Sequence, residues 1–321
     1  MRVAKFVLAA VVSFAATMAQ AAALKFLEIP ADASGPAISA IMWSPCATPP
    51  DKLRLRAFVV PAVRDCPIAG ERLPLIVISH GHGGTYLGHH DTAEVLADAG
   101  FVVVALNHPG DTASEMSRAG NLSVLIERPA DVKRLTDYML GPAPDAAKLD
   151  PRRIGFFGFS RGGYTGLVIA GANPDFQHAT PPCPDPQAPI CAALRRHEVP
   201  SQPLVHDPRV KALVIADPLS FFPTPDSLRE VKVPVQLWSS ERGDDDVLPH
   251  SVAALVDDLP AKPEFHLVRN AGHFAFLTPC PTELASGVPE LCSDAAGFDR
   301  VAFHQEFDAQ VLRFFRDHLG G

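Results

Sequence analysis

The chain has 321 residues, of which 47% are hydrophobic and 20% charged, and its formal net charge is −8. This is the composition of an ordinary globular protein, and it excludes a disordered charged tail, a collagen-like chain and a coiled coil. The negative net charge also argues against a general electrostatic attraction to nucleic acid or to an anionic membrane surface.

Residues 1–21 have the pattern of a secretory signal peptide. Two basic residues precede an apolar run over residues 6–16, and residues 19–21 form an A-x-A cleavage site. The run is too short for a membrane anchor, and small residues rather than charged ones follow it. We expect cleavage after Ala21 or Ala23 and a protein that is periplasmic or secreted, with no integral membrane segment after cleavage.

Short apolar runs alternate with helical patterns along the rest of the chain. An antiparallel start to a sheet is predicted at Leu24–Ile29, Ile38–Trp43 and Leu53–Val60. Continuously apolar runs, typical of strands buried on both faces of a parallel sheet, follow at Leu73–Ser79, Phe101–Asn107, Arg153–Phe159, Val210–Ala216, Val233–Ser239 and Glu264–Val268. The predicted helices are Asp91–Ala99, Pro129–Leu140, Gly162–Ala172, Val247–Leu259 and Phe298–Leu319.

This alternation predicts the α/β class, with a mostly parallel, doubly wound sheet that has an antiparallel N-terminal start. Residues 22–321 are expected to form a single domain. One stretch, Asn173–Pro208, is rich in proline and has weak periodicity. It is expected to run over the carboxyl ends of the strands, where ligands bind in doubly wound sheets, either as a lid or as a passive loop.

Six cysteines occur in this chain, and an even number in an exported protein suggests disulfides. Sequence alone allows 15 connectivities. Because the cysteines fall in three local pairs within loop-like stretches, we predict nearest-neighbour pairing. The expected pairs are Cys46 with Cys66, Cys183 with Cys191, and Cys280 with Cys292. The absence of a C-x2-C spacing argues against zinc.

Ser160 stands in the sequence Gly158-Phe159-Ser160-Arg161-Gly162, a G-x-S-x-G pattern. The pattern directly follows a predicted strand and opens a predicted helix, which is the setting of a nucleophile elbow. Its glycines are expected to be required because a side chain at either position would collide with a neighbouring element. The alternative is an ordinary glycine-rich turn between a strand and a helix. The sequence therefore predicts Ser160 as a nucleophile.

A serine hydroxyl needs a base to remove its proton, and the expected chain order is Ser, acid, His. His273 follows the last predicted strand and is the expected base. The other late histidines lie next to an acid-rich loop, within a strand or in the C-terminal helix, at His250, His266, His304 and His318.

The acid should orient the histidine and stabilise its charged form. The loop after the strand Val233–Ser239 carries three consecutive aspartates. In the serine hydrolases that this Ser, acid, His order resembles, the acid commonly stands four residues before a proline, and that resemblance implies Asp245. Asp244 and, at the end of the preceding strand, Asp217 are the alternatives.

The oxyanion of the transition state needs backbone N–H donors. One is expected from Arg161, the residue after the nucleophile, and the other from the loop His80–Gly84. His82 is the favoured donor of that loop and Gly83 the alternative. The Arg161 side chain is expected either to meet an anionic substrate or to pair with a surface carboxylate.

A metal site is the competing interpretation of the histidines near this loop, which are His80, His82, His89 and His90. No carboxylate falls at a recognisable ligand spacing from them. We therefore expect neither a metal nor another cofactor.

Together these segments resemble the α/β-hydrolase superfamily and, more narrowly, the predicted dienelactone hydrolase and platelet-activating-factor acetylhydrolase-like group. The resemblance spans about residues 73 to 280 and rests on Ile78–Gly83, Asn107–Asp111, Arg128–Asp131, Arg153–Gly163, Asp207–Ala212 and Ala271–Phe276. It implies the α/β-hydrolase fold and carboxylic ester hydrolysis. Dienelactone hydrolases themselves use a cysteine nucleophile, whereas this chain has Ser160.

The expected function is that of an exported serine esterase or lipase-like hydrolase, acting on a small-molecule or lipid-like ester through an acyl-enzyme. Amide or peptide cleavage on the same triad and a non-catalytic binding protein on this scaffold are the alternatives. Aromatic residues are candidates for lining an apolar substrate pocket, with core packing as the competing role, at Tyr86, Phe221, Phe222, Trp238, Phe274 and Phe276.

Overall fold

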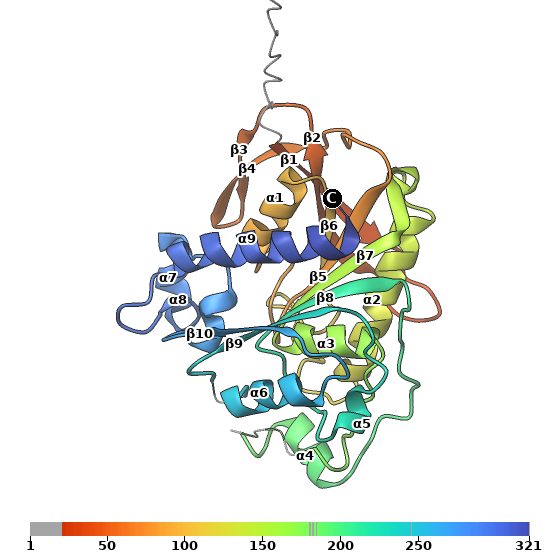
Figure 1. Cartoon of the computed structure of the whole chain (residues 1–321), viewed down its shortest axis with the longest axis vertical. Coiled ribbons are helices and arrows are strands. Elements are labelled where there is room, and N and C mark those ends of the chain that lie inside the picture. Colours follow the sequence, from red (N-terminus) through yellow and green to blue (C-terminus); the bar gives the residue numbers. More distant parts are fainter. Residues whose placement is uncertain (1–20, 180, 182, 184, 245, 321) are drawn as a thin grey trace, which may run out of the picture.

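Over the described residues, ten strands form one sheet with helices on both of its faces (Figure 1). The structure is a computed structural model that describes residues 21–179, 181, 183, 185–244 and 246–320. The predicted signal peptide therefore lies outside the described residues, apart from Ala21. The strands are β1 (Ala21–Ile29), β2 (Ile38–Cys46), β3 (Asp51–Leu55), β4 (Phe58–Arg64), β5 (Leu73–Ser79), β6 (Val102–Leu106), β7 (Leu149–Phe159), β8 (Val210–Ala216), β9 (Val235–Ser240) and β10 (Glu264–Val268).

The sheet is mostly parallel and has an antiparallel start, as predicted. Its strand order is β10-β9-β8-β7-β5-β6-β2-β1-β4-β3. Neighbours from β10 to β6 pair in parallel, whereas β2 pairs antiparallel with both β6 and β1. The order reverses around β5, which lies between β7 and β6. In doubly wound sheets, ligands bind at the carboxyl ends of the strands beside such a switch point.

The helices are α1 (His90–Asp98), α2 (Val124–Leu140), α3 (Arg161–Ile169), α4 (Pro189–Arg195), α5 (Pro225–Leu228), α6 (Pro249–Asp258), α7 (Thr282–Gly287), α8 (Pro289–Cys292) and α9 (Arg300–Leu319). Two 3-10 helices, η1 (Ala146–Lys148) and η2 (His273–Phe276), complete the described elements. Helices α1 and α9 pack on one face of the sheet, and α2, α3 and α6 pack on the other (Figure 1).

Each face of the sheet buries its own apolar core. In β5, Leu75 and Val77 belong to the core under α2 and α3, whereas Ile76 and Ile78 belong to the core under α1 and α9. Successive strand residues point to opposite faces, so a strand covered on both sides must be apolar throughout. This explains the continuous apolar runs that the sequence shows.

Two predicted boundaries differ from the structure. The strand predicted at 53–60 is a hairpin of β3 and β4 that turns at Arg56, whose φ is 54°. The helix predicted to begin at Pro129 begins at Val124 and contains the proline. The first three residues of α2 are buried in the core, and this burial extends the helix past a residue that lacks a backbone N–H.

Three disulfides join each cysteine to its neighbour in sequence, as predicted, between Cys46 and Cys66, Cys183 and Cys191, and Cys280 and Cys292. The second disulfide lies in the proline-rich excursion and includes the start of α4. The third closes the stretch that contains α7 and α8. In Figure 1, α4 lies at the bottom, beneath α3, α5 and α6.

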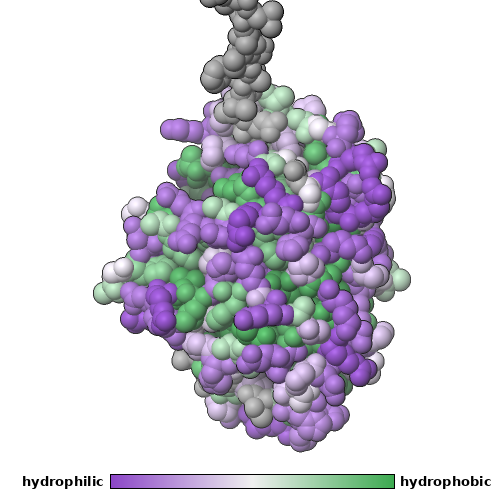
Figure 2. All heavy atoms as spheres, in the orientation of Figure 1, coloured by the Kyte–Doolittle hydropathy of each residue, from purple (hydrophilic) through white to green (hydrophobic). Residues whose placement is uncertain are grey.

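The surface is largely hydrophilic on the face shown in Figure 2, where apolar residues form small patches between polar ones. Among the described helices, none combines the length and apolarity needed to cross a bilayer.

His89 is a buried titratable group between α1 and the sheet. Its ring packs against Phe157 and Phe159, with centroid distances of 5.0 and 5.5 Å. Burial lowers its pKa to about 4 from an ordinary value of 6.5. The unfolded chain therefore binds a proton at His89 below about pH 6.5, whereas the folded state binds it only below about pH 4. The folded state consequently loses stability as the pH falls across this interval.

His89→Leu is expected to remove this acid sensitivity. The difference in free energy of unfolding, variant minus parent, should be about 2–3 kcal/mol larger at pH 4.5 than at pH 7, because one group contributes about 1.4 kcal/mol per pH unit. Urea unfolding at the two pH values measures the difference. An equal difference at both would contradict this interpretation of His89.

Candidate active site

Ser160 lies at the turn between β7 and α3, in a backbone conformation that L residues rarely adopt. Its φ is 55° and its ψ is −118°. Its N–H donates to the Ala216 carbonyl at 2.9 Å, and its own carbonyl accepts from the N–H groups of Leu219 and Tyr164 at 3.0 and 3.1 Å. Such strain persists where the surroundings over-determine it, and it clusters at active sites. The local structure is the strand–turn–helix elbow that the sequence predicts.

Two glycines make this turn possible. A Cβ atom at Gly158 would overlap the Gly162 carbonyl across the turn, and one at Gly162 would overlap the Ser79 carbonyl at the end of β5. Both obstacles are backbone atoms that cannot move aside as a side chain could. The turn can therefore bring α3 against β5 and β7 only with glycine at both positions.

His273 begins η2 after β10 and packs beside the serine turn. Its ring lies on Phe159, the residue before Ser160, with centroids 4.5 Å apart. Its Nδ1 lies 3.1 Å from Asp217 Oδ2, and both side chains are buried. When Nδ1–H donates to Asp217, Nε2 is left unprotonated and can accept a proton.

Asp217 follows β8, the strand next to β7, with a positive φ of 39°. The Ser240 N–H donates to Asp217 Oδ1 at 2.7 Å, and the Ser240 hydroxyl donates to Oδ2. The Asp217 N–H donates to the Trp238 carbonyl at 2.9 Å. These donors satisfy a buried carboxylate and fix it opposite His273.

The predicted acid, Asp245, lies outside the described residues. Its neighbour Asp244 approaches the other ring nitrogen, with Oδ2 3.7 Å from His273 Nε2. Asp244 Oδ1 accepts from the N–H groups of Asp246 and Val247 at 2.9 and 2.6 Å, so it also caps its own turn. A carboxylate beside Nε2 cannot hold the proton on Nδ1. The structure places Asp217, the alternative from the preceding strand, beside Nδ1 of His273.

The loop after β5 also lies next to Ser160 and His273. The Gly83 N–H donates to Asp111 Oδ1 at 3.1 Å, so it is not free to donate to a bound substrate. His82, next to it, is exposed and borders the cavities around Ser160. This arrangement favours His82 over Gly83 as a donor to a bound oxyanion. Desolvation of the ring and the Arg161 charge lower the pKa of the His82 side chain.

Asp111 is buried between two arginines. Its Oδ2 accepts from Arg128 Nη1 at 2.6 Å and from Arg161 Nη1 at 3.0 Å. Burial raises the pKa of Asp111, but the two guanidinium charges outweigh it, and the pKa lies below its ordinary value. The Arg161 side chain thus pairs with a buried carboxylate, whereas the sequence suggested a surface carboxylate or an anionic substrate. Because Asp111 also accepts from the Gly83 N–H, it ties the loop after β5 to the residue after Ser160.

His80 supports the same loop from inside. Its Nε2 accepts from the His108 N–H at 3.2 Å, so Nδ1 carries the proton and donates to the Gly81 carbonyl at 2.6 Å. Burial and the Arg128 charge lower its pKa to about 3. His80 is therefore neutral, and both of its nitrogens fix the shape of the loop.

A second polar cluster lies behind η2. His304 Nδ1 is 2.7 Å from Asp91 Oδ2, and His304 Nε2 donates to the Ala275 carbonyl at 2.9 Å. Burial opposes ionisation of both groups, but their contact lowers the pKa of Asp91 and raises that of His304. Asp91, His304 and Asp308 offer ligand atoms within 4.8 Å of one another, the one such set among the described residues. Because His304 donates to a carbonyl of η2, the helix that begins with His273, this cluster can be explained as structural support for that helix.

The aromatic residues singled out in the sequence are divided between the site and the cores. Phe221 and Phe274 border the cavities around Ser160. Phe222 stacks on Tyr164 and lines a neighbouring hollow. Trp238 stacks on His266, with centroids 4.0 Å apart, and Phe276 is buried in the core beneath α9. The remaining aromatic residue, Tyr86, packs edge-on against Phe26.

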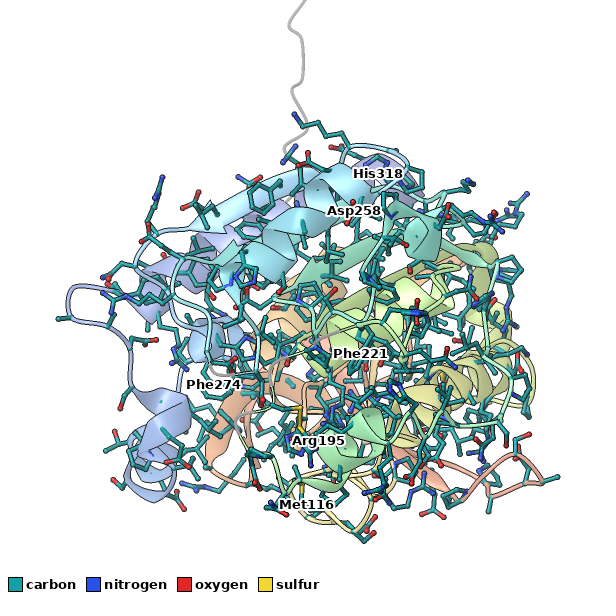
Figure 3. The ribbon with its side chains drawn as sticks, turned by 90° about the horizontal axis from the view of Figure 1, so that it is seen from below. Met116, Arg195, Phe221, Asp258, Phe274 and His318 are labelled. Carbon is teal, nitrogen blue, oxygen red and sulfur yellow. A yellow bond between two sulfur atoms is a disulfide. The ribbon has the colours of Figure 1, made fainter. Side chains whose placement is uncertain are left out.

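Two cavities meet at Ser160. The larger, of about 260 Å³, lies between the serine turn and α4 and is bordered by Arg161 and Phe221. The smaller, of about 160 Å³, lies beside His273 and Phe274. Described residues of the excursion, among them Ile190 and Leu194, therefore share a cavity with Ser160 at the end of β7. Figure 3 looks onto this side of the molecule, with Phe221 near the centre, above α4, and Phe274 on the side of α7 and α8.

Comparison with solved structures finds a similar chain in a ferulic acid esterase from Streptomyces cinnamoneus. The TM-score is 0.65 and the sequence identity 18%, over 95% of this chain and 91% of that one. No family model and no curated protein sequence matches the chain. The resemblance to the dienelactone hydrolase-like group thus stays a prediction. Together with the sheet order and the serine turn, the structural likeness shows that the chain has an α/β-hydrolase-like fold.

Proposed function

We propose that the protein is an exported serine esterase that cleaves carboxylic esters through an acyl-enzyme. One observation carries the proposal: a strained serine turn lies beside a buried histidine whose Nδ1 is 3.1 Å from the carboxylate of Asp217. Ser160 and His273 border one cavity. Nucleophile, base and orienting acid are the three groups that serine acyl transfer requires.

In the proposed reaction, Ser160 Oγ attacks the ester carbonyl while His273 Nε2 takes its proton. Asp217 keeps the other proton on Nδ1 and stabilises the imidazolium that forms. The backbone N–H groups of His82 and Arg161 bind the oxyanion. His273 then protonates the leaving alcohol, and a water molecule activated by the same histidine hydrolyses the acyl-enzyme.

Export is supported by the three disulfides, which persist in oxidising compartments. Of the two cleavage points, we propose the one after Ala21. Ala22 and Ala23 are buried in β1, where they pair with β2, so cleavage after Ala23 would remove two more residues of the sheet than cleavage after Ala21.

Turnover of an ester panel by the mature protein tests the proposal. Because the structural neighbour is a ferulic acid esterase, the panel contains esters of ferulic acid beside p-nitrophenyl esters, with the matching anilides as amide controls. We expect hydrolysis of esters and much slower cleavage of anilides. Preferential cleavage of anilides, or no turnover of any ester, would contradict the proposal.

Asp111 gives a prediction about the oxyanion site. Asp111→Asn should lower kcat by about 10- to 100-fold with KM little changed, because displacing an oxyanion donor weakens binding of the transition state and not of the substrate. Asp207→Asn is the matched control, since Asp207 is also buried and paired with an arginine, Arg209, outside the site. Equal kcat values for the two variants would overturn this role.

A further inference from the structure

The direction of proton transfer assigns each cavity to one half of an ester. In the proposed reaction, on which this inference rests, His273 gives its proton to the leaving alcohol. The alcohol oxygen must therefore lie beside His273, which lines the smaller cavity with Phe274 and Leu277. The alcohol belongs in that cavity, and the acyl group extends in the other direction, into the larger one.

The larger cavity suits a compact apolar group. Leu219 and Phe221 border it on the side of the sheet, and Ile190 and Leu194 border it on the side of α4. Arg161 also borders it, and its guanidinium pairs with Asp111, which favours a neutral acyl group. The cavity volume of about 260 Å³ lies just below the range of about 300–1,000 Å³ that is typical of pockets for drug-sized ligands. This is room for an aromatic acid or a medium-length chain, and a long fatty chain exceeds it.

Each cavity takes part of its wall from a segment that a disulfide closes. Cys183, Ile190 and Cys191 border the larger cavity, and residues 183 and 191 are joined. Leu291 borders the smaller cavity and lies just before Cys292, which is joined to Cys280. In Figure 3, α4, which belongs to the first wall, lies near Phe221. The helices α7 and α8, which belong to the second wall, lie beyond Phe274.

We infer that two segments determine the two parts of the substrate specificity: the described residues of segment 183–194 hold a medium-sized apolar acyl group, and segment 280–292 holds the alcohol. The disulfides keep these walls at fixed distances from Ser160. The remaining disulfide, between Cys46 and Cys66, joins β2 to the residues after β4, and neither cysteine lines either cavity.

Two tryptophan substitutions of partly buried wall residues test the assignment. Ile190→Trp narrows the larger cavity and Leu291→Trp the smaller one. Acyl selectivity is the kcat/KM ratio of p-nitrophenyl octanoate to acetate, and alcohol selectivity is the ratio of 2-naphthyl to methyl butanoate. We expect Ile190→Trp to lower the acyl ratio at least about tenfold and to change the alcohol ratio less than about twofold. Leu291→Trp should do the reverse.

Serine replacement of each disulfide pair gives a second, matched series. The pair Cys183→Ser and Cys191→Ser should change the acyl ratio alone, and the pair Cys280→Ser and Cys292→Ser the alcohol ratio alone. The pair Cys46→Ser and Cys66→Ser controls for loss of a disulfide as such and should change neither ratio.

The inference is overturned if the two tryptophan variants exchange effects, or if neither ratio moves while the parent remains active. A parent protein that hydrolyses no ester would overturn the proposed function instead. The two failures are therefore distinct. Selective shifts in both series, in the expected directions, support the assignment of both walls.

Discussion

Ser160→Ala is expected to lower kcat/KM for ester hydrolysis by about 10⁴-fold or more, which is the loss that removal of a triad nucleophile usually causes. Alanine keeps the Cβ atom, so the elbow between β7 and α3 can form with its glycines in place. The loss should therefore fall on the chemical step and leave folding intact. Rates with p-nitrophenyl esters, measured beside thermal unfolding of the variant, check this.

Ser286→Ala is the matched control for this change. Ser286 lies in α7, is exposed and donates only to the Thr282 carbonyl in its own helix. It should keep the parental rate. A Ser160→Ala protein that folds and retains that rate would show that another group attacks the ester.

Asp217→Asn should lower kcat by about 10⁴-fold with a much smaller change in KM. The amide has nearly the same shape, but its NH₂ group can donate to His273 Nδ1 and so favours the tautomer with the proton on Nε2. That tautomer cannot accept the serine proton. Measurement of kcat and KM for one ester separates this loss from a loss of substrate binding.

The neighbouring aspartates provide the contrast. Asp244 lies 3.7 Å from Nε2 rather than Nδ1, so Asp244→Asn is expected to cost less than about tenfold in kcat. Asp245→Asn, made at the residue that the sequence favoured, should likewise have a small effect. If kcat fell about 10⁴-fold in either of these variants while Asp217→Asn stayed active, the acid would instead be in the loop after β9.

The sheet and the serine turn could be predicted because each leaves a local mark in the sequence. A strand covered on both faces must be apolar at every position, so runs such as Leu73–Ser79 can be recognised without long-range information. At Gly158 and Gly162, backbone atoms occupy the space of a side chain, which makes the glycine spacing specific. Disulfide pairing was equally local, because each cysteine has its partner within 20 residues.

The acid could not be chosen in the same way. Three consecutive aspartates after β9 look equivalent in sequence, and the choice depends on which strand end the His273 ring faces. The available signal was weaker: Asp217 directly follows the continuous apolar run of β8, whose end pairs with that of β7. Pairing of β8 beside β7 is a property of the topology, so this signal acquires meaning only once the strand order is known.

The buried polar network under the oxyanion loop was also out of reach of sequence patterns. Asp111, Arg128 and Arg161 are far apart in the chain and are buried only because they satisfy one another. The sequence suggests an anionic substrate or a surface carboxylate as the partner of Arg161, because no local pattern indicates that this arginine is buried. Whether such charged residues are buried depends on partners that only the three-dimensional structure shows.

Covalent labelling with a fluorophosphonate tests the central claim most directly, because such reagents react with an activated serine whatever the natural substrate is. The account predicts one equivalent of label, full loss of ester hydrolysis, and an adduct that peptide mass spectrometry locates at Ser160. Asp217→Asn should label far more slowly, since its histidine cannot take the serine proton. Label on another residue, or hydrolysis that continues in fully labelled protein, would contradict the assignment of Ser160 as the nucleophile.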